Sequence, residues 1–176
     1  RQAAALRAGR GQAGRAMLAR GHQLAIDDHS MIGWCIAHKQ ARIALDVGQD
    51  AVRFENPFLP GTRSEMALPL MAGDRAIGAV SVQSERKAAF SQDDIDSLQA
   101  MANLLTVAIE KLTQTGKAVS IPLPWDGKAL HLSGEVAWVA ALGHEAHLGV
   151  ARKLNELERY LWAAGQPLAA REGSAE

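Results

Sequence analysis

Two mainly apolar runs flank a short polar turn, and they form the clearest pattern in the chain. The first run begins at Ser64 and reads SEMALPLMA, and the second reads RAIGAVSVQS. The turn between them, Ala72-Gly73-Asp74-Arg75, has the composition of turns that close β-hairpins. The sequence therefore predicts an antiparallel hairpin over residues 64–84.

A capped amphipathic helix is predicted directly after this hairpin. Ser91 is a favourable N-cap, and Asp93 and Asp94 follow in the first turn, where the helix dipole favours negative charge. Apolar residues then recur at steps of three and four to about residue 112, and Gly116 is a plausible C-terminal stop. The apolar stripe consists of Leu98, Met101, Ala102, Leu105, Ala108, Ile109 and Leu112.

Weaker patterns precede the hairpin. The segments AAALRA and HQLAI are expected to be strands, and Ser30 is expected to cap a short helix, MIGWCIAHKQ. ARIALDV alternates as a strand, with Arg42 and Asp46 on the face opposite Ile43, Leu45 and Val47. A loop over residues 48–63 follows, in which prolines disfavour a helix. Loops of this length often carry binding residues.

The hairpin, the capped helix and its apolar face, together with SMIGWCIAHKQARIALDV and NPFLPGTRSE, resemble a GAF domain over about residues 1–113. GAF domains are small-ligand sensing modules of signalling proteins. The resemblance implies an α+β fold, in which helices flank an antiparallel sheet. A complete GAF domain normally begins with a long helix and another central strand, so we expect an N-terminally incomplete domain. An open sheet edge would then invite pairing with another chain.

The character of the chain changes after residue 113, where we place a domain boundary. Residues 114–176 are expected to form a small β-rich appendage, because Asp126-Gly127 and Leu142-Gly143-His144 are turn-like breaks between short apolar runs. NELERYLWAA is predicted to be a short helix, and the tail LAAREGSAE to be disordered. Residues 118–162 resemble the C-terminal half of a PilZ domain. The two motifs with which PilZ domains bind cyclic di-GMP are absent, so that ligand is not carried over.

Composition narrows the functional classes. The 176 residues carry a formal net charge of zero with acids and bases interspersed, which gives no electrostatic footprint for nucleic acid or an anionic membrane surface. No apolar run approaches the length of a membrane span. The basic start, RQAAALRAGRG, lacks the apolar region of a secretory signal. A single cysteine excludes an internal disulfide framework, and a cytoplasmic protein is expected.

The cysteine is the main candidate for chemistry. Cys35 and His38 would be neighbours on one helix face, where a Cys–His pair can form a reactive thiolate. The alternative, which we favour, is a small apolar core residue. Free methionine sulfoxide reductases are a GAF-like branch whose mechanism resembles one that uses several cysteines, and this chain has only one. GAF domains that attach a bilin to a Cys often have His directly after it, where this chain has Ile36. His144 and His147 lack a third ligand, so no metal site, cofactor or catalytic residue is predicted.

Polar residues on both sides of the long loop are the candidate ligand site. In a GAF-like fold Asp46 and Thr62 to Glu65 would lie around the mouth of the ligand pocket. Arg53 and Arg63 could hold an anion, although we favour structural ion pairs of Arg63 and Glu65 with Asp46 or Glu55. The signature of cyclic-nucleotide GAF domains is not found. The candidate ligand-binding residues are Trp34, Cys35, Asp46, Arg53, Phe54, Thr62, Arg63, Ser64 and Glu65.

Taken together, these features predict a non-catalytic sensory or regulatory module of a signal-transduction protein that binds an unknown small molecule and regulates an output domain. A scaffold or dimerisation module without a ligand is the alternative, and a cysteine-dependent redox enzyme is third. The wide apolar stripe near Ala108 and Ile109 also predicts a homodimer with two-fold symmetry.

Overall fold

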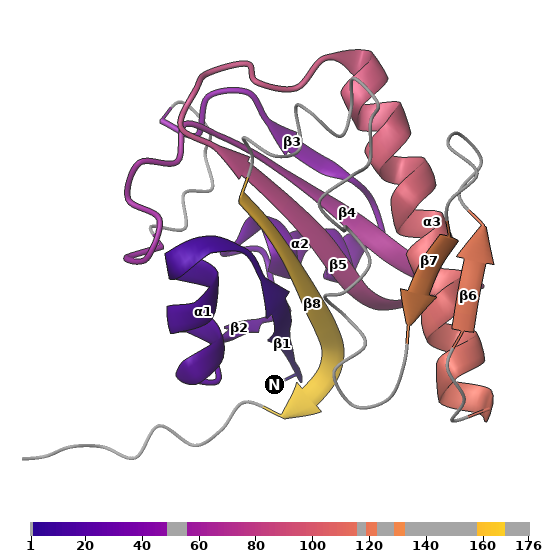
Figure 1. The fold of residues 1–176 in the computed structure, drawn as a ribbon. Helices are drawn as coiled ribbons and strands as arrows, with labels where there is room; N and C mark the ends of the chain where they lie inside the picture. Colours follow the sequence, from indigo (N-terminus) through magenta and orange to yellow (C-terminus); the bar gives the residue numbers. More distant parts are fainter. Residues whose placement is uncertain (1, 49–55, 116–118, 123–128, 133–157, 168–176) are drawn as a thin grey trace, which may run out of the picture.

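The computed structural model describes residues 2–48, 56–115, 119–122, 129–132 and 158–167 (Figure 1). Its three helices and eight strands within these ranges are β1 (Gln2–Gly9), α1 (Gly11–Ala19), β2 (Gln23–Ala25), α2 (Met31–His38), β3 (Arg42–Ala44), β4 (Ser64–Ala72), β5 (Arg75–Ser84), α3 (Gln92–Thr115), β6 (Val119–Pro122), β7 (Ala129–Leu132) and β8 (Glu158–Pro167). Six strands form one antiparallel sheet in the order β2-β1-β8-β5-β4-β3. The α+β class predicted from the sequence is confirmed.

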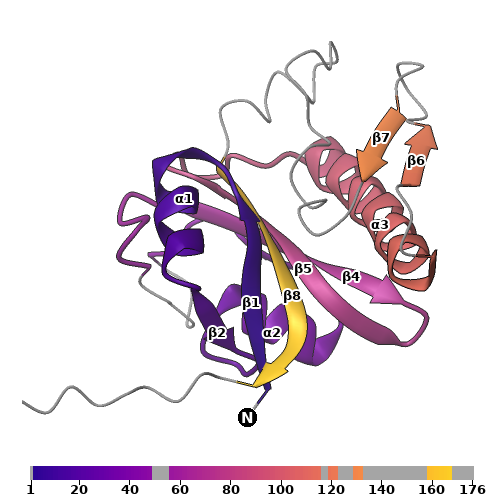
Figure 2. The ribbon, with the colours of Figure 1, turned by 60° about the horizontal axis from the view of Figure 1, so that its bottom comes forward.

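Strand β4 shows how the sheet separates two cores. Met66, Leu68 and Leu70 point to one face, where they pack against residues of α3. Ala67 points to the other face, where it packs with residues of α2. This alternation follows from the two-residue period of a strand that is buried on both sides. Helices α2 and α3 accordingly lie on opposite faces of the sheet (Figure 2).

The predicted helix starts are confirmed in atomic detail. The Ser30 hydroxyl accepts a hydrogen bond from the backbone N–H of Gly33 at 2.9 Å, so α2 begins with a side-chain cap. At α3, the Asp94 carboxylate accepts hydrogen bonds from the Ser91 backbone N–H at 2.8 Å and from its hydroxyl at 2.6 Å. The Ser91 hydroxyl accepts from the backbone N–H of Asp94 at 3.3 Å. This reciprocal arrangement is a capping box.

The predicted hairpin is formed by β4 and β5. Ala72 pairs with Arg75, and the register shifts between Leu70 and Met71. Gly73 lies in the turn with φ of 57°, a left-handed conformation in which glycine carries no steric cost. The hairpin supplies two neighbouring strands of the sheet, and their α2-facing residues become important at the site described below.

The predicted helix over NELERYLWAA is wrong. Residues Glu158–Pro167 form strand β8, which lies between β1 and β5 and pairs antiparallel with both. The leucine spacing suggested a helix, but two strand edges flank this position, and tertiary pairing overrides a short helical pattern. Thus a strand from the segment expected to be a separate appendage completes the centre of the larger sheet (Figure 1).

The rest of the C-terminal segment is described only in part. Strands β6 and β7 pair antiparallel, as the turn-like Asp126-Gly127 suggested, and the hairpin lies beside the C-terminal part of α3 (Figures 1 and 2). The predicted turn at residues 142–144 and the predicted disordered tail lie outside the described residues. The PilZ resemblance and the division after residue 113 stay predictions.

Two local features differ from the sequence expectations. Helix α1 was not predicted, because its N-cap, Arg10, makes no side-chain capping hydrogen bond and its first turn has no acidic residue. In β3, the alternation was predicted correctly, but the apolar side points outward: Ile43 is 36% exposed and Leu45 49%. The opposite side of β3, with Arg42 and Ala44, therefore faces the α2 side of the sheet.

The apolar stripe of α3 packs against its own sheet. Leu98, Met101, Ala102 and Ile109 are buried in one core with residues of β4 and β5, and Leu105 packs at its margin. Ile109, one of the residues on which the predicted homodimer rested, is therefore covered within the chain. Dimerisation stays a prediction.

Candidate functional site

Five polar side chains gather on the α2-facing side of the sheet. Directly paired residues of antiparallel strands project to the same face. Glu65 pairs with Gln83, and Ala67 pairs both with Ser81 and with Arg42 on the far side. Thr62 reaches the same group from the residues just before β4. We call this group the polar cluster: Arg42, Thr62, Glu65, Ser81 and Gln83.

Hydrogen bonds connect three members of the polar cluster. The Thr62 hydroxyl donates to Gln83 Oε1 at 2.8 Å, and Gln83 Nε2 donates to Glu65 Oε1 at 3.4 Å. Gln83 is 7% exposed, so its amide is fixed within the protein. Thr62 and Glu65 are only partly buried. The cluster thus combines buried members on β5 with the partly exposed Thr62 and Glu65.

Helix α2 contributes an aromatic side chain to this rim. The Arg42 guanidinium carbon lies 4.9 Å from the centroid of the Trp34 ring, a cation–π distance. Trp34 also stacks on His38, with ring centroids 4.5 Å apart, and His38 Nε2 lies 2.7 Å from Asp28 Oδ1. The Ser30 cap fixes the start of α2, so this row of rings positions Arg42 from a rigid element.

Two buried polar atoms of the cluster have no hydrogen-bond partner in the described part of the chain. They are Nη1 of Arg42 and Oγ of Ser81. Ser81 is fully buried. Buried polar groups are nearly always paired, and leaving one unpaired costs about 1–3 kcal/mol. Two such atoms on one sheet face mark this as a place where the protein's own hydrogen bonding is incomplete.

The carboxyl group of Glu65 has an unusual acidity. Desolvation raises its pKa from 4.5 to about 7, although the nearby Arg42 charge acts in the opposite direction. Near neutral pH both protonation states are therefore populated, so the group can donate or accept a hydrogen bond. Perturbed acids of this kind are enriched at functional sites.

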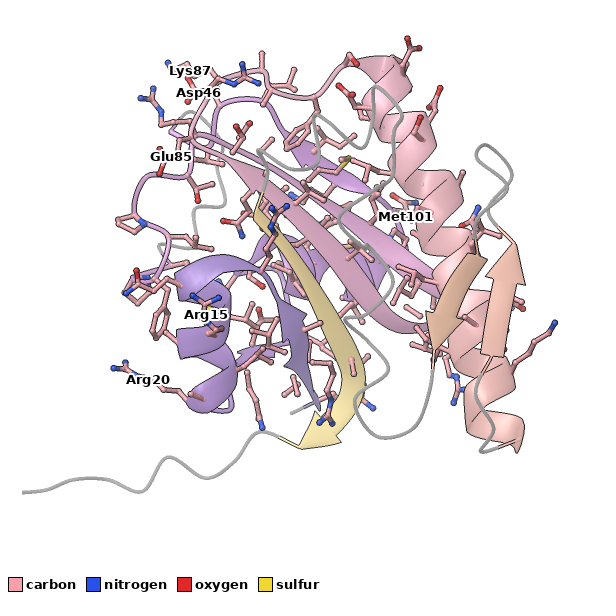
Figure 3. The ribbon with its side chains drawn as sticks, viewed as in Figure 1. Arg15, Arg20, Asp46, Glu85, Lys87 and Met101 are labelled. Carbon is pink, nitrogen blue, oxygen red and sulfur yellow. The ribbon has the colours of Figure 1, made fainter. Side chains whose placement is uncertain are left out.

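Asp46 and Arg63, two predicted site residues, belong to a group of ion pairs with Lys87. Asp46 Oδ2 lies 2.6 Å from Lys87 Nζ, and Asp46 Oδ1 lies 4.0 Å from Arg63 Nη2 (Figure 3). A hydrogen bond from Lys87 is the main cause that lowers the pKa of Asp46. These ions tie the end of β3 to the segments flanking β4 and β5. The favoured interpretation of Arg63 as an ion-pair partner of Asp46 is supported, but no ion pair joins Glu65 to Asp46 among the described residues.

The other predicted residues divide into three groups. Trp34, Thr62 and Glu65 belong to or border the polar cluster. Ser64 does not: it is fully buried, and its hydroxyl donates to the Arg86 carbonyl at 2.8 Å. Arg53 and Phe54 lie outside the described residues. Phe58, which follows them in the same loop, packs at the margin of the α2-side core.

Cys35 is a core residue, as favoured from the sequence. It is fully buried in the core beneath α2, and burial raises the pKa of its thiol to about 12. A thiolate is the nucleophilic form of cysteine, so this environment suppresses reactivity at neutral pH. Its neighbour His38 points instead to Asp28.

The described residues show neither a metal-binding cluster nor a membrane-spanning helix. Among them, no cluster of three or more His, Cys, Asp or Glu side chains is placed to bind a metal ion. No helix in the described ranges combines the length and the apolar character that crossing a bilayer requires. His144 and His147 lie outside those ranges.

Sequence reasoning missed three members of the polar cluster: Arg42, Ser81 and Gln83. A signal for two of them was present, because Ser81 and Gln83 alternate with Val80 and Val82 in a strand otherwise apolar. A polar residue at alternate positions of a doubly buried strand indicates a specific polar environment on one face. Arg42 could not be assigned to the cluster from the sequence, because the sheet face to which it belongs depends on the pairing of β3 with β4.

Comparison with solved structures finds several to which the chain is similar. The chain is similar to the type II free methionine-R-sulfoxide reductase of Thermoplasma acidophilum (16% identity, 62% of this chain and 79% of that one, TM-score 0.48). It is also similar to the Neisseria meningitidis free methionine-R-sulfoxide reductase, solved with its substrate (25% identity, 53% of this chain and 54% of that one, TM-score 0.48). A third similar structure is the GAF domain region of a putative membrane protein from Geobacter sulfurreducens PCA (19% identity, 62% of this chain and 81% of that one, TM-score 0.47).

Sequence comparison identifies the family. No curated protein matches the chain. The GAF domain family model matches residues 3–110, which is more than half of the chain and includes all five members of the polar cluster. The chain therefore belongs to the GAF domain family.

Proposed function

We propose that this chain is a non-catalytic sensory module that binds a small ligand at the polar cluster. Membership of the GAF family supports a small-ligand sensory role in general. The observation that carries the proposal is the pair of buried, unpartnered polar atoms, Arg42 Nη1 and Ser81 Oγ, on one sheet face. A ligand that pairs with both would recover hydrogen bonds that the described part of the protein leaves unmade.

The proposed mechanism is a population shift. A ligand that binds one arrangement of the cluster better than another stabilises that arrangement by its difference in affinity. Helix α2 would respond directly, because Trp34 contacts Arg42. Strand β8 would respond through backbone pairing, because Ser81 pairs with Tyr160 and Gln83 with Glu158. An output domain in a cytoplasmic signalling protein would read this change.

Replacement of Ser81 by alanine separates a binding role from a structural one. We expect the free energy of unfolding to stay unchanged or to rise by up to about 1 kcal/mol, because the variant removes an unpaired buried hydroxyl. Ligand binding should weaken at the same time. The measurements are denaturant unfolding and a thermal-shift screen against amino acids, nucleotides, sugars and organic acids.

The matched control is Thr106→Val, which removes a buried hydroxyl on the opposite face of the sheet. The Thr106 hydroxyl donates to the Ala102 carbonyl within α3 at 3.0 Å, so this variant should lose about 1 kcal/mol of stability and retain ligand binding. The proposal fails if Ser81→Ala is clearly destabilising and leaves binding unchanged. A chain that binds none of these compounds would favour the scaffold alternative.

The cysteine-dependent enzyme is not proposed. Its support was Cys35, and that thiol is buried in the core with a strongly raised pKa.

A further inference from the structure

The unused hydrogen-bonding capacity of the polar cluster is biased toward donors. A guanidinium nitrogen can only donate, and the Ser81 hydroxyl has a proton to donate. The Gln83 amide is already engaged at both ends, since its oxygen accepts from Thr62 and its nitrogen donates to Glu65. A ligand that completes this cluster must therefore present an acceptor atom to Arg42, and a second acceptor would use the proton of the Ser81 hydroxyl.

The two donors lie across a small residue. Arg42 and Ser81 are both paired with Ala67, on β3 and β5 respectively. Neighbouring strands are about 4.8 Å apart, so the backbones of β3 and β5 are separated by roughly 10 Å, with one methyl group projecting between them. The long Arg42 side chain and Ser81 thus belong to the same sheet face, and a group with two acceptor oxygens can pair with both donors.

Charge favours an anion at this position. In the described residues no ion pair joins Arg42 to a carboxylate; its guanidinium faces the Trp34 ring instead. Glu65 is the acidic group that faces Arg42 within the cluster, and its raised pKa leaves it partly protonated near neutral pH. The guanidinium charge is therefore incompletely neutralised, and a charge-assisted hydrogen bond to an oxyanion would be strong.

We propose that the polar cluster binds a small monocarboxylic acid, whose carboxylate accepts hydrogen bonds from Arg42 and Ser81. This inference rests on the proposed function and adds the chemical class of the ligand. One guanidinium and one neutral hydroxyl match a single negative charge better than the double charge of phosphate.

The test compares matched ligands on the full chain. Sodium acetate, butyrate and hexanoate are titrated at constant ionic strength, together with acetamide, butyramide, hexanamide and inorganic phosphate, with thermal shift and calorimetry as readouts. We expect saturable binding of at least one carboxylate, at least tenfold tighter than its amide. Arg42→Gln should weaken that binding at least tenfold, whereas Glu65→Gln, which removes a competing acid, should strengthen it.

Two further variants keep the test interpretable. Arg15→Gln removes an exposed arginine on α1 and should leave binding unchanged. Arg42→Lys keeps the charge if Arg42→Gln does not fold, and it should bind the carboxylate more weakly than the wild type but more tightly than it binds the amide. Equal binding of acid and amide, preferred binding of phosphate or no binding of any carboxylate overturns the inference. If an uncharged compound binds the wild type but not the Ser81→Ala variant, the proposed ligand class is overturned and the proposed function stands.

Discussion

Replacement of Ala163 by proline should destabilise the whole domain by roughly 3 kcal/mol, because Ala163 lies in the centre of β8 and pairs with strands on both sides. Its partners are Ala5 of β1 and Gly78 of β5. Proline removes the backbone N–H and cannot be accommodated in a central strand. Urea unfolding of the full chain, monitored by tryptophan fluorescence, measures the loss.

The control for this prediction is Ala129→Pro at the start of β7, which belongs to the separate two-stranded sheet. Its cost should stay below about 1 kcal/mol, since β6 and β7 do not join the larger sheet. Similar small effects of the two proline variants would mean that β8 is not a required central strand.

A methyl group added at Gly33 should have the second large effect. A Cβ atom there would overlap the Ala25 carbonyl oxygen and would lie 2.8 Å from that of Asp27. These are backbone atoms, so α2 must move away from β2. We expect Gly33→Ala to cost about 1–3 kcal/mol, and ligand binding to weaken because α2 carries Trp34.

Gly48→Ala is the matched control for Gly33→Ala. The added Cβ at Gly48 would meet the nearest atom, Oδ1 of Asp46, at 3.5 Å, an ordinary contact. Its effect on stability should therefore lie within about 0.5 kcal/mol. Thermal unfolding of both variants, with the wild type, measures the difference. A Gly33→Ala protein as stable as Gly48→Ala would contradict the close approach of α2 to β2.

Local signals explain the parts of the fold that could be predicted. Ser30, Ser91 and Gly73 act through hydrogen bonds or backbone conformations within a few residues, so their roles are visible in the sequence. Strand β8 could not be predicted in this way. Its conformation is set by β1 and β5, which lie far away along the chain, and the spacing of Leu157 and Leu161 fitted a helix equally well.

The candidate site was predicted in part for the same reason. Thr62 and Glu65 were identified because they stand between a long loop and a recognisable hairpin. Ser81 and Gln83 become neighbours of Glu65 only through the register of β4 and β5. Arg42 joins them because β3 turns its apolar side outward, which no local pattern indicated. Side chains that become neighbours only through strand register cannot be identified from a local sequence pattern.

The central claim is that a small molecule binds on the α2 side of the sheet, and a ¹H–¹⁵N correlation spectrum of the full chain tests it most directly. We predict that a compound from the metabolite panel shifts the Trp34 indole and the Thr62 and Gln83 amides saturably, and leaves Thr106 on the opposite side unchanged. Saturable shifts confined to α3, or no saturable shift with any compound of the panel, would contradict the claim.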